Sequence, residues 1–171
     1  MAFSLLLLVF IYYPIISLYL FPPKIDRQVL TKSLYIEIPK INVASQIIPN
    51  VDPFNETEYR KSLENGIAHA KNTSLPGEKG TSFLFAHSSD SPWRITRYNI
   101  AFFRLPELKR EDSINIFRNG KTYKYKVSDK KTVWPNEVNY LLNTQKDQLI
   151  LQTCVPIGTS LKRLLVFADP I

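Results

Sequence analysis

The residues of this chain best suited to covalent chemistry lie near its carboxyl end. Cys154 is the only cysteine among 171 residues, and it lies in the segment LILQTCVPIGTSLKRLLVFA. Two apolar runs of this segment, Leu149–Thr153 and Leu164–Ala168, are separated by turn residues and predict two buried strands. Cys154 ends the first strand and Arg163 opens the second, so a strand–turn–strand brings the thiol close to a permanent cation.

This arrangement suits a nucleophilic thiol. A cation beside a cysteine favours the thiolate, which is the form that attacks. An arginine next to a reacting carbonyl also stabilises the negative charge that develops there. The apolar run Thr81–Ala86 predicts a strand that carries His87 at its end. Together the three side chains supply the nucleophile, the proton carrier and the oxyanion stabiliser that acyl transfer by a thiol requires.

The cysteine segment resembles the signature of the sortase family. Sortases carry a Thr-Leu-x-Thr-Cys motif at the end of one strand and an Arg at the start of the next. The residues LQTC, which end at Cys154, match the last four motif positions, and Ile150 stands in place of the first threonine. Pro156 and Arg163 also fall where the family has them.

The histidine segment resembles the same family. Sortases have a His, then a Thr and a Pro-Gly pair, then a strand that ends in a second, catalytic His. The residues HAKNTSLPGEKG, which begin at His69, match the first part of this pattern, and His87 matches the catalytic position. Ala86 replaces the glycine that many members have before that histidine.

The resemblance implies a fold and a reaction. The fold is all-β and mainly antiparallel, a closed eight-stranded barrel with short helices. Cys154 is the implied nucleophile, His87 the general acid and base, and Arg163 the stabiliser of oxyanion and substrate. The implied substrate is a C-terminal Leu-Pro-x-Thr-Gly-like sorting signal, cut after Thr through a thioester. The acceptor is an amine of a peptidoglycan precursor or a pilin lysine, and no cofactor is implied.

Other roles stay open at this stage. Thr153 and Ser88 are candidate substrate-binding residues, but Thr153 also suits a strand and Ser88 an exposed loop. His69 is expected to be structural, although it is a rival partner for Cys154. Trp134 is expected to pack rather than to flank a groove. Two alternative functions are a thiol peptidase that releases its product to water and an inactive barrel that binds sorting peptides.

Hydrophobic alternation and turn residues predict the other elements. A hairpin is centred on Asn119-Gly120, and Glu56–Glu64 predicts a helix that covers one end of the barrel rather than a groove wall. Gly66–Gly80 is predicted to be a loop. Further short strands are predicted at 34–39, 41–43, 46–48, 113–117, 122–127 and 131–134.

The amino-terminal residues predict a membrane anchor. Residues 2–21 contain no charge, and a helix of that length spans about 30 Å, the thickness of the bilayer hydrocarbon. A cleaved signal peptide is disfavoured because a basic start and a small-x-small site are missing. We therefore expect an anchor at 1–23, a linker at 24–33 and a catalytic domain at 34–171.

The orientation of this anchor rests on conflicting signals. Lys24, Arg27 and Lys32 follow the span, and the positive-inside rule applied literally places the domain in the cytoplasm. The family resemblance implies a single-pass protein of the cell membrane with its domain outside the cytoplasm, and we adopt that expectation. Basic residues before Met1 would reconcile the two.

Composition narrows the classes further. The formal charge is +7, but Lys and Arg are dispersed, which favours a basic surface facing an anionic envelope over nucleic-acid binding. One cysteine excludes an internal disulfide and a CxxC zinc site. Two histidines without an HExxH motif predict no metal site.

Overall fold

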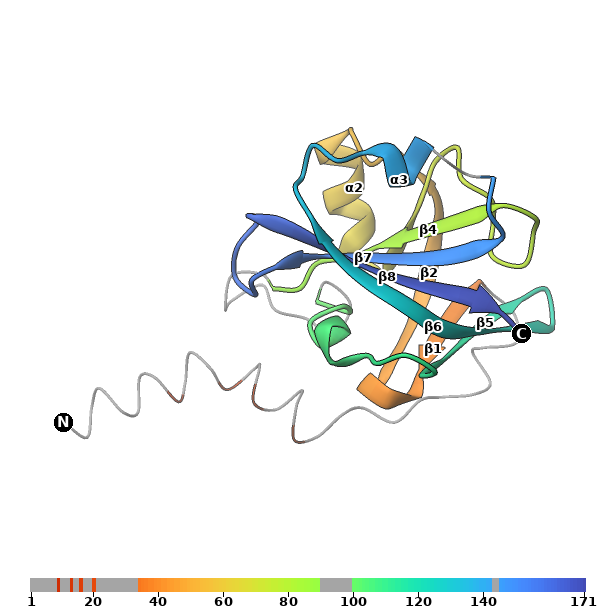
Figure 1. Ribbon diagram of the computed structural model, residues 1–171. Coiled ribbons are helices and arrows are strands. Elements are labelled where there is room, and N and C mark those ends of the chain that lie inside the picture. Colours follow the sequence, from red (N-terminus) through yellow and green to blue (C-terminus); the bar gives the residue numbers. More distant parts are fainter. Residues whose placement is uncertain are drawn as a thin grey trace.

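The fold is a closed β-barrel, seen in a computed structural model that describes residues 9, 13, 16, 20, 34–89, 100–142 and 145–171 (Figure 1). The strand order around the barrel is β1-β2-β3-β4-β7-β8-β6-β5. The bounds of the strands are β1 (Tyr35–Ile38), β2 (Val43–Val51), β3 (Ile67–Ala70), β4 (Thr81–Phe85), β5 (Ser113–Arg118), β6 (Lys121–Val133), β7 (Gln148–Val155) and β8 (Lys162–Pro170). The helical elements are η2 (Pro39–Ile41), α2 (Glu56–Leu63), η4 (Leu105–Glu107) and α3 (Asn139–Leu142).

The predicted closed eight-stranded barrel is confirmed, and its sheet is mixed. The pairs β2–β3 and β4–β7 are parallel, and the other neighbouring pairs are antiparallel. Apolar side chains of all eight strands fill the interior, among them the fully buried Ile36, Leu84, Ile114, Leu151 and Val166. Closure removes the open sheet edges at which other chains could pair.

The predicted anchor and linker, residues 1–33, lie almost entirely outside the described residues. Within the part of the chain that the structure describes, no helix is both long and apolar enough to span a bilayer. The anchor therefore stays a prediction.

Strand β2 replaces the two short strands predicted at 41–43 and 46–48. Pro39 starts the 3-10 turn η2, which takes up Ile41, and Asn42 ends it with a φ of 54°. Beyond this turn the chain extends without a break over Val43–Val51. The prediction was wrong because pairing with β1 on one side and β3 on the other holds residues of weak strand propensity in line.

Strand β3 lies inside the segment predicted to be a loop. Its four residues, IAHA, form too short a segment to show a hydrophobic alternation, yet all four are buried. The strand exists because it is parallel to β2 and antiparallel to β4. His69 consequently lies within a strand and points into the protein.

The predicted hairpin at Asn119-Gly120 is confirmed. Both residues have positive φ, 52° and 74°, which is the conformation that a two-residue hairpin turn requires. The predicted separate strand at 131–134 is instead the end of β6, whose register with β8 shifts between Val127 and Asp129. Polar residues around that bulge interrupt the alternation of apolar and polar residues, so the sequence pattern does not predict one continuous strand.

His69 completes a second bulge, in β2. The register of β2 with β3 shifts between Ile48 and Val51, where Pro49 has no N–H to donate and Asn50 has a φ of 60°. The Asn50 N–H donates instead to Nδ1 of His69 at 3.2 Å. Nε2 of His69 then donates to the carbonyl of Ser74 at 3.1 Å, in a ring that is only 3% exposed. This pattern requires the neutral imidazole with its proton on Nε2.

We predict that the barrel loses stability as the pH falls below about 6.5, the ordinary pKa of histidine. Burial lowers the pKa of His69 in the folded protein, so the unfolded chain binds the proton more readily and stability rises with pH through this window. Thermal unfolding from pH 7.5 to pH 5 measures the effect. A His69→Gln variant should show a flatter profile, and an unchanged slope in that variant would contradict the prediction.

Gly77 provides a second test of the fold. Its φ is +90°, and an added Cβ would overlap the ring of Tyr123. Its N–H donates to the Tyr125 hydroxyl at 2.9 Å, which ties the β3–β4 loop to β6. Gly120 has a φ of +74° and open space around it, so it shares the backbone constraint without the overlap.

We expect Gly77→Ala to lower the free energy of unfolding by about 2–5 kcal/mol, the sum of left-handed strain and overpacking. Gly120→Ala should cost only the strain, about 1–2 kcal/mol. Chemical denaturation of the two variants measures the difference. Equal losses in both would show that Tyr123 moves aside without cost.

Candidate active site

Strand register brings His87, Cys154 and Arg163 into one row. Cys154 of β7 is the direct cross-strand partner of Arg163 of β8, so both side chains lie on the same face of the sheet. On the other side of β7, Phe85 of β4 is paired with Gln152 in a parallel register. Two residues further along the chain in each case are His87, just beyond the end of β4, and Cys154, and both line the same cavity.

Two hydrogen bonds hold the end of β4 against β7 at this point. The Ala86 N–H donates to the carbonyl of Gln152 at 3.2 Å. In the opposite direction, the Thr153 hydroxyl donates to the carbonyl of Ala86 at 2.9 Å. Thr153 is 1% exposed and its hydroxyl lies on the interior side of the sheet, so only its backbone faces the site. The sequence left the role of Thr153 open. In the structure its side chain hydrogen-bonds to Ala86 and so holds the residue before His87 in place.

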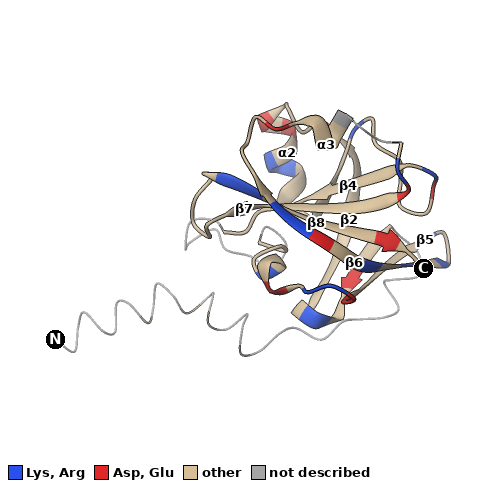
Figure 2. Cartoon of the chain, in the orientation of Figure 1, with Lys and Arg blue, Asp and Glu red and all other residues tan. Residues whose placement is uncertain are grey.

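Arg163 is held by the turn that precedes β8. Its Nη1 donates to the carbonyl of Ser160 at 2.9 Å and to that of Lys162 at 3.4 Å. Cys154 and Arg163 are both half-buried, so the thiol and the guanidinium can be reached from solvent without being freely solvated. Figure 2 shows the basic residues at the start of β8, where this turn ends.

The three side chains line one groove, a cavity of about 210 Å³ on the outer face of the barrel. Its floor is apolar and comes from β4 and β8, with Phe83, Phe85 and Leu165. The segment after β6, including α3, forms one wall, and α2 forms the other (Figure 1). The groove therefore runs from His87, Cys154 and Arg163 along the sheet, between two short helices.

Helix α2 is a wall of this groove, so the prediction that it only covers a barrel end was wrong. The side chain of Asn55 caps its first turn by accepting from the Glu58 N–H at 3.2 Å. Tyr59 and Leu63, four residues apart, then face the groove. Tyr59 meets Phe85 edge to face, with ring centroids 6.2 Å apart, which anchors the helix to the sheet.

Trp134 also differs from expectation, because it is 53% exposed and lines the groove rather than packing in the core. The Lys162 ammonium lies 4.7 Å from its ring centroid, a cation–π contact across the mouth of the site. Trp93, the other tryptophan, lies outside the described residues.

Ser88 is 1% exposed, so the expectation of an exposed loop serine was wrong. Alternation along the chain turns it away from the face that His87 occupies, and its Oγ has no hydrogen-bond partner among the residues that the structure describes. His69 uses both ring nitrogens in hydrogen bonds within the β2–β4 region and does not line the groove.

Several groove residues were missed by the sequence analysis. Phe54 is 70% exposed beside α2, Glu137 follows β6, and Tyr140 belongs to α3. These residues lie in polar, proline-containing segments without hydrophobic periodicity, so the sequence pattern does not identify them as part of a site. Among the described residues no cluster of three His, Cys, Asp or Glu side chains is placed to hold a metal ion.

The site can therefore present a thiol, an imidazole and a guanidinium to a peptide that lies in an apolar groove. Such a groove binds extended, apolar segments, and the three polar groups at one end determine where reaction occurs. The arrangement is suited to acyl transfer through a thioester.

Comparisons with known proteins agree with this geometry. A family model described as a sortase domain matches residues 36–171. Sortase A of Bacillus anthracis is 28% identical over 150 residues, which cover 85% of this chain and 68% of that protein. Sortase D of Bacillus subtilis (strain 168) is 27% identical over 136 residues, 77% of this chain and 60% of that protein.

Solved structures extend the similarity to the fold. Sortase C-1 from Actinomyces oris superposes with a TM-score of 0.66 at 30% identity, covering 81% of this chain and 72% of that one. Because the family match spans nearly all of the barrel, from β1 to the last residue, the chain belongs to the sortase family of cysteine transpeptidases.

Proposed function

We propose that this protein is a sortase that cleaves a C-terminal, Leu-Pro-x-Thr-Gly-like sorting signal and transfers the protein to an amine of a peptidoglycan precursor or a pilin. The row of His87, Cys154 and Arg163 at one end of an apolar groove is the observation that carries this proposal. An anchor at residues 1–23 would hold the domain on the outer side of the cell membrane, where both substrates occur.

The first half-reaction forms a thioester. The Cys154 thiolate attacks the carbonyl carbon of the motif threonine, and the negative charge moves to the carbonyl oxygen. Arg163 stabilises this oxyanion because its guanidinium is fixed beside the sulfur by strand pairing and by the Ser160 carbonyl. Protonated His87 donates its proton to the leaving amine as the C–N bond breaks.

The second half-reaction reverses these roles. An acceptor amine attacks the thioester carbonyl, neutral His87 takes its proton, and the thiolate of Cys154 leaves. Water is the competing nucleophile, which is the reaction of the alternative thiol peptidase. A new amide bond is the product only if the acceptor arrives before water does.

The groove fits the acyl side of such a substrate. An extended peptide rises about 3.3 Å per residue, so the four residues from Leu to Thr of the motif span about 13 Å. Apolar side chains from β4, β8 and α2 line this length, which suits Leu and Pro. We assign no further contact to Thr153 beyond its backbone, because its hydroxyl is bonded to Ala86.

We predict that Cys154→Ala abolishes turnover. Intact-mass spectrometry of the wild-type domain with a sorting peptide should show an acyl adduct on Cys154, and the variant should show none. Added amine should divert the thioester from hydrolysis to ligation, because an amine is the better nucleophile for a thioester. Exclusive hydrolysis at high amine concentration would support the peptidase, and peptide binding without any adduct would support the inactive barrel.

We predict that Arg163→Lys lowers kcat by about 10²–10³, the effect of removing one oxyanion donor. A lysine keeps the charge but loses the planar fork that the Ser160 carbonyl positions. Steady-state kinetics with one fluorescent sorting peptide measures the loss. Arg118→Lys, the same substitution at the far end of the barrel on β5, serves as the control and should leave kcat unchanged. Near-normal kinetics for Arg163→Lys would refute the assigned role.

A further inference from the structure

A second cavity, of about 470 Å³, lies on the same outer face of the sheet as the catalytic groove. Glu137 and Tyr140 line both cavities, so the segment around α3 separates them. Cross-strand pairing places Phe83, Ile150 and Phe167 in one row of this face, below the row that contains Cys154. The residues that line the second cavity include Lys131, Tyr140, Lys146, Gln148, Ile150 and Phe167.

Its distance from the catalytic sulfur matches a peptide that extends past the sorting motif. Ile150 and Gln148 lie four and six residues before Cys154 on β7, which is about 13 and 20 Å at 3.3 Å per residue. In a substrate that extends along β7 from the scissile bond, the four motif residues reach as far as the first of these distances. The next two residues upstream, which precede the motif leucine, fall beside Ile150 and Gln148 in the second cavity. Lys131 reaches this cavity from β6, where its backbone pairs with Leu165 at the level of Gln152.

The donors in this cavity suit a carboxylate. The Lys131 ammonium donates to the Tyr140 hydroxyl at 2.6 Å and lies 5.3 Å from the centre of its ring. Because this hydroxyl accepts from the ammonium, its own proton remains for another acceptor. The Tyr140 ring is held edge-on against Phe167, with centroids 5.8 Å apart, so the hydroxyl has a fixed position. Lys131 and Tyr140 therefore present two neighbouring donors.

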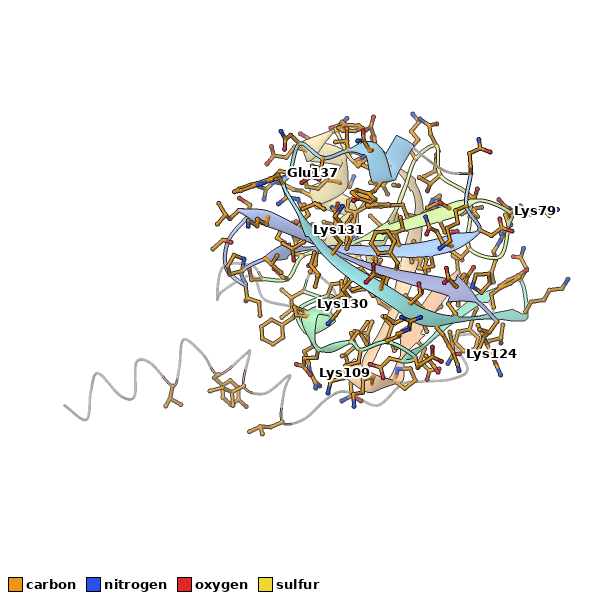
Figure 3. The ribbon with its side chains drawn as sticks, in the orientation of Figure 1. Lys79, Lys109, Lys124, Lys130, Lys131 and Glu137 are labelled. Carbon is orange, nitrogen blue, oxygen red and sulfur yellow. The ribbon has the colours of Figure 1, made fainter. Side chains whose placement is uncertain are left out.

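The other charges around Lys131 leave it cationic. The Tyr140 hydroxyl, followed by Glu137 and Asp129, raises the pKa of Lys131 above its ordinary value. Lys146, the second ammonium of the cavity, is paired with Asp169 at 3.0 Å. Figure 3 shows Lys131 on β6 and Glu137 just beyond the end of that strand, on the same side of the barrel.

We propose that this second cavity is a subsite for an acidic side chain that precedes the sorting motif, with Lys131 and Tyr140 binding its carboxylate. The proposal rests on the proposed function, because it requires the acyl side of a sorting peptide to lie along β7. Glu137 lines both cavities and accepts from the Trp134 N–H at 2.8 Å, so its carboxylate bounds the subsite without selecting a position along the peptide.

The test uses three peptides that share one sorting motif and differ only in the two residues before the motif leucine: Glu-Glu, Gln-Gln or Lys-Lys. We expect the wild-type protein to cleave the Glu-Glu peptide with a kcat/KM about tenfold above that for Gln-Gln at low salt, and to cleave Lys-Lys most slowly. The preference should shrink as salt rises, because the subsite is exposed to solvent.

Substitutions inside and outside the second cavity test which residues cause the Glu-Glu preference. Lys131→Met should reduce the Glu-Glu preference to less than about threefold, and Tyr140→Phe should reduce it while keeping the ring on Phe167. Lys124→Met removes another exposed lysine of β6, outside this cavity, and should keep the full preference. The ratio between peptides is the readout, so a change in the basal rate does not affect it.

The possible outcomes distinguish failure of the acidic subsite from failure of the proposed sortase function. Cleavage of all three peptides with equal kcat/KM, or an undiminished preference in Tyr140→Phe, would overturn the acidic subsite and leave the sortase assignment intact. If the wild-type protein turns over none of the peptides, the proposed function fails and the subsite fails with it. Thermal unfolding of each variant establishes that the compared proteins are folded.

Discussion

The pairing register of β7 with its two neighbours is the constraint on which the rest of the site depends. Side chains alternate between the two faces of a sheet, so a slip of one residue would send Cys154 into the barrel. The register with β8 sets Cys154 opposite Arg163, and the parallel pairing of β4 with β7 ends two residues before His87, which lines the same cavity. Closure of the barrel fixes both registers at once, because each strand is held on two sides.

Backbone groups near the site are bonded in ways that reinforce this register. Thr153 uses its hydroxyl to hold the carbonyl of Ala86, one residue before His87. His69 performs a comparable task in β2, where it accepts the N–H that the bulge at Pro49 leaves without a strand partner. Both are polar side chains 3% exposed or less that hydrogen-bond to main-chain groups, and the loss of such a buried partner is costly.

The walls of the groove come from elements outside the barrel. Helix α2 contributes Tyr59, and α3 contributes Tyr140, and each ring meets a phenylalanine of the sheet edge to face. These contacts give the flat outer face of β4, β7 and β8 its walls. The same α3 segment lies between the cavity beside Cys154 and the cavity beside Lys131, and its Tyr140 lines both.

The sequence by itself determined the hairpin at Asn119-Gly120 and the candidates Cys154, His87 and Arg163, because turn residues and motif spacing are local properties. The closed barrel was implied by the resemblance of its motifs to those of the sortase family. The sequence did not reveal β3, the unbroken β6 or the groove walls. Those depend on pairing between segments distant in the chain, which supplies the burial and hydrogen bonds that their own residues do not specify. Only the tertiary structure decided that Ser88 is buried, that Trp134 is exposed and that a second cavity adjoins the groove that Cys154 lines, because each depends on how segments distant in the chain pack against one another.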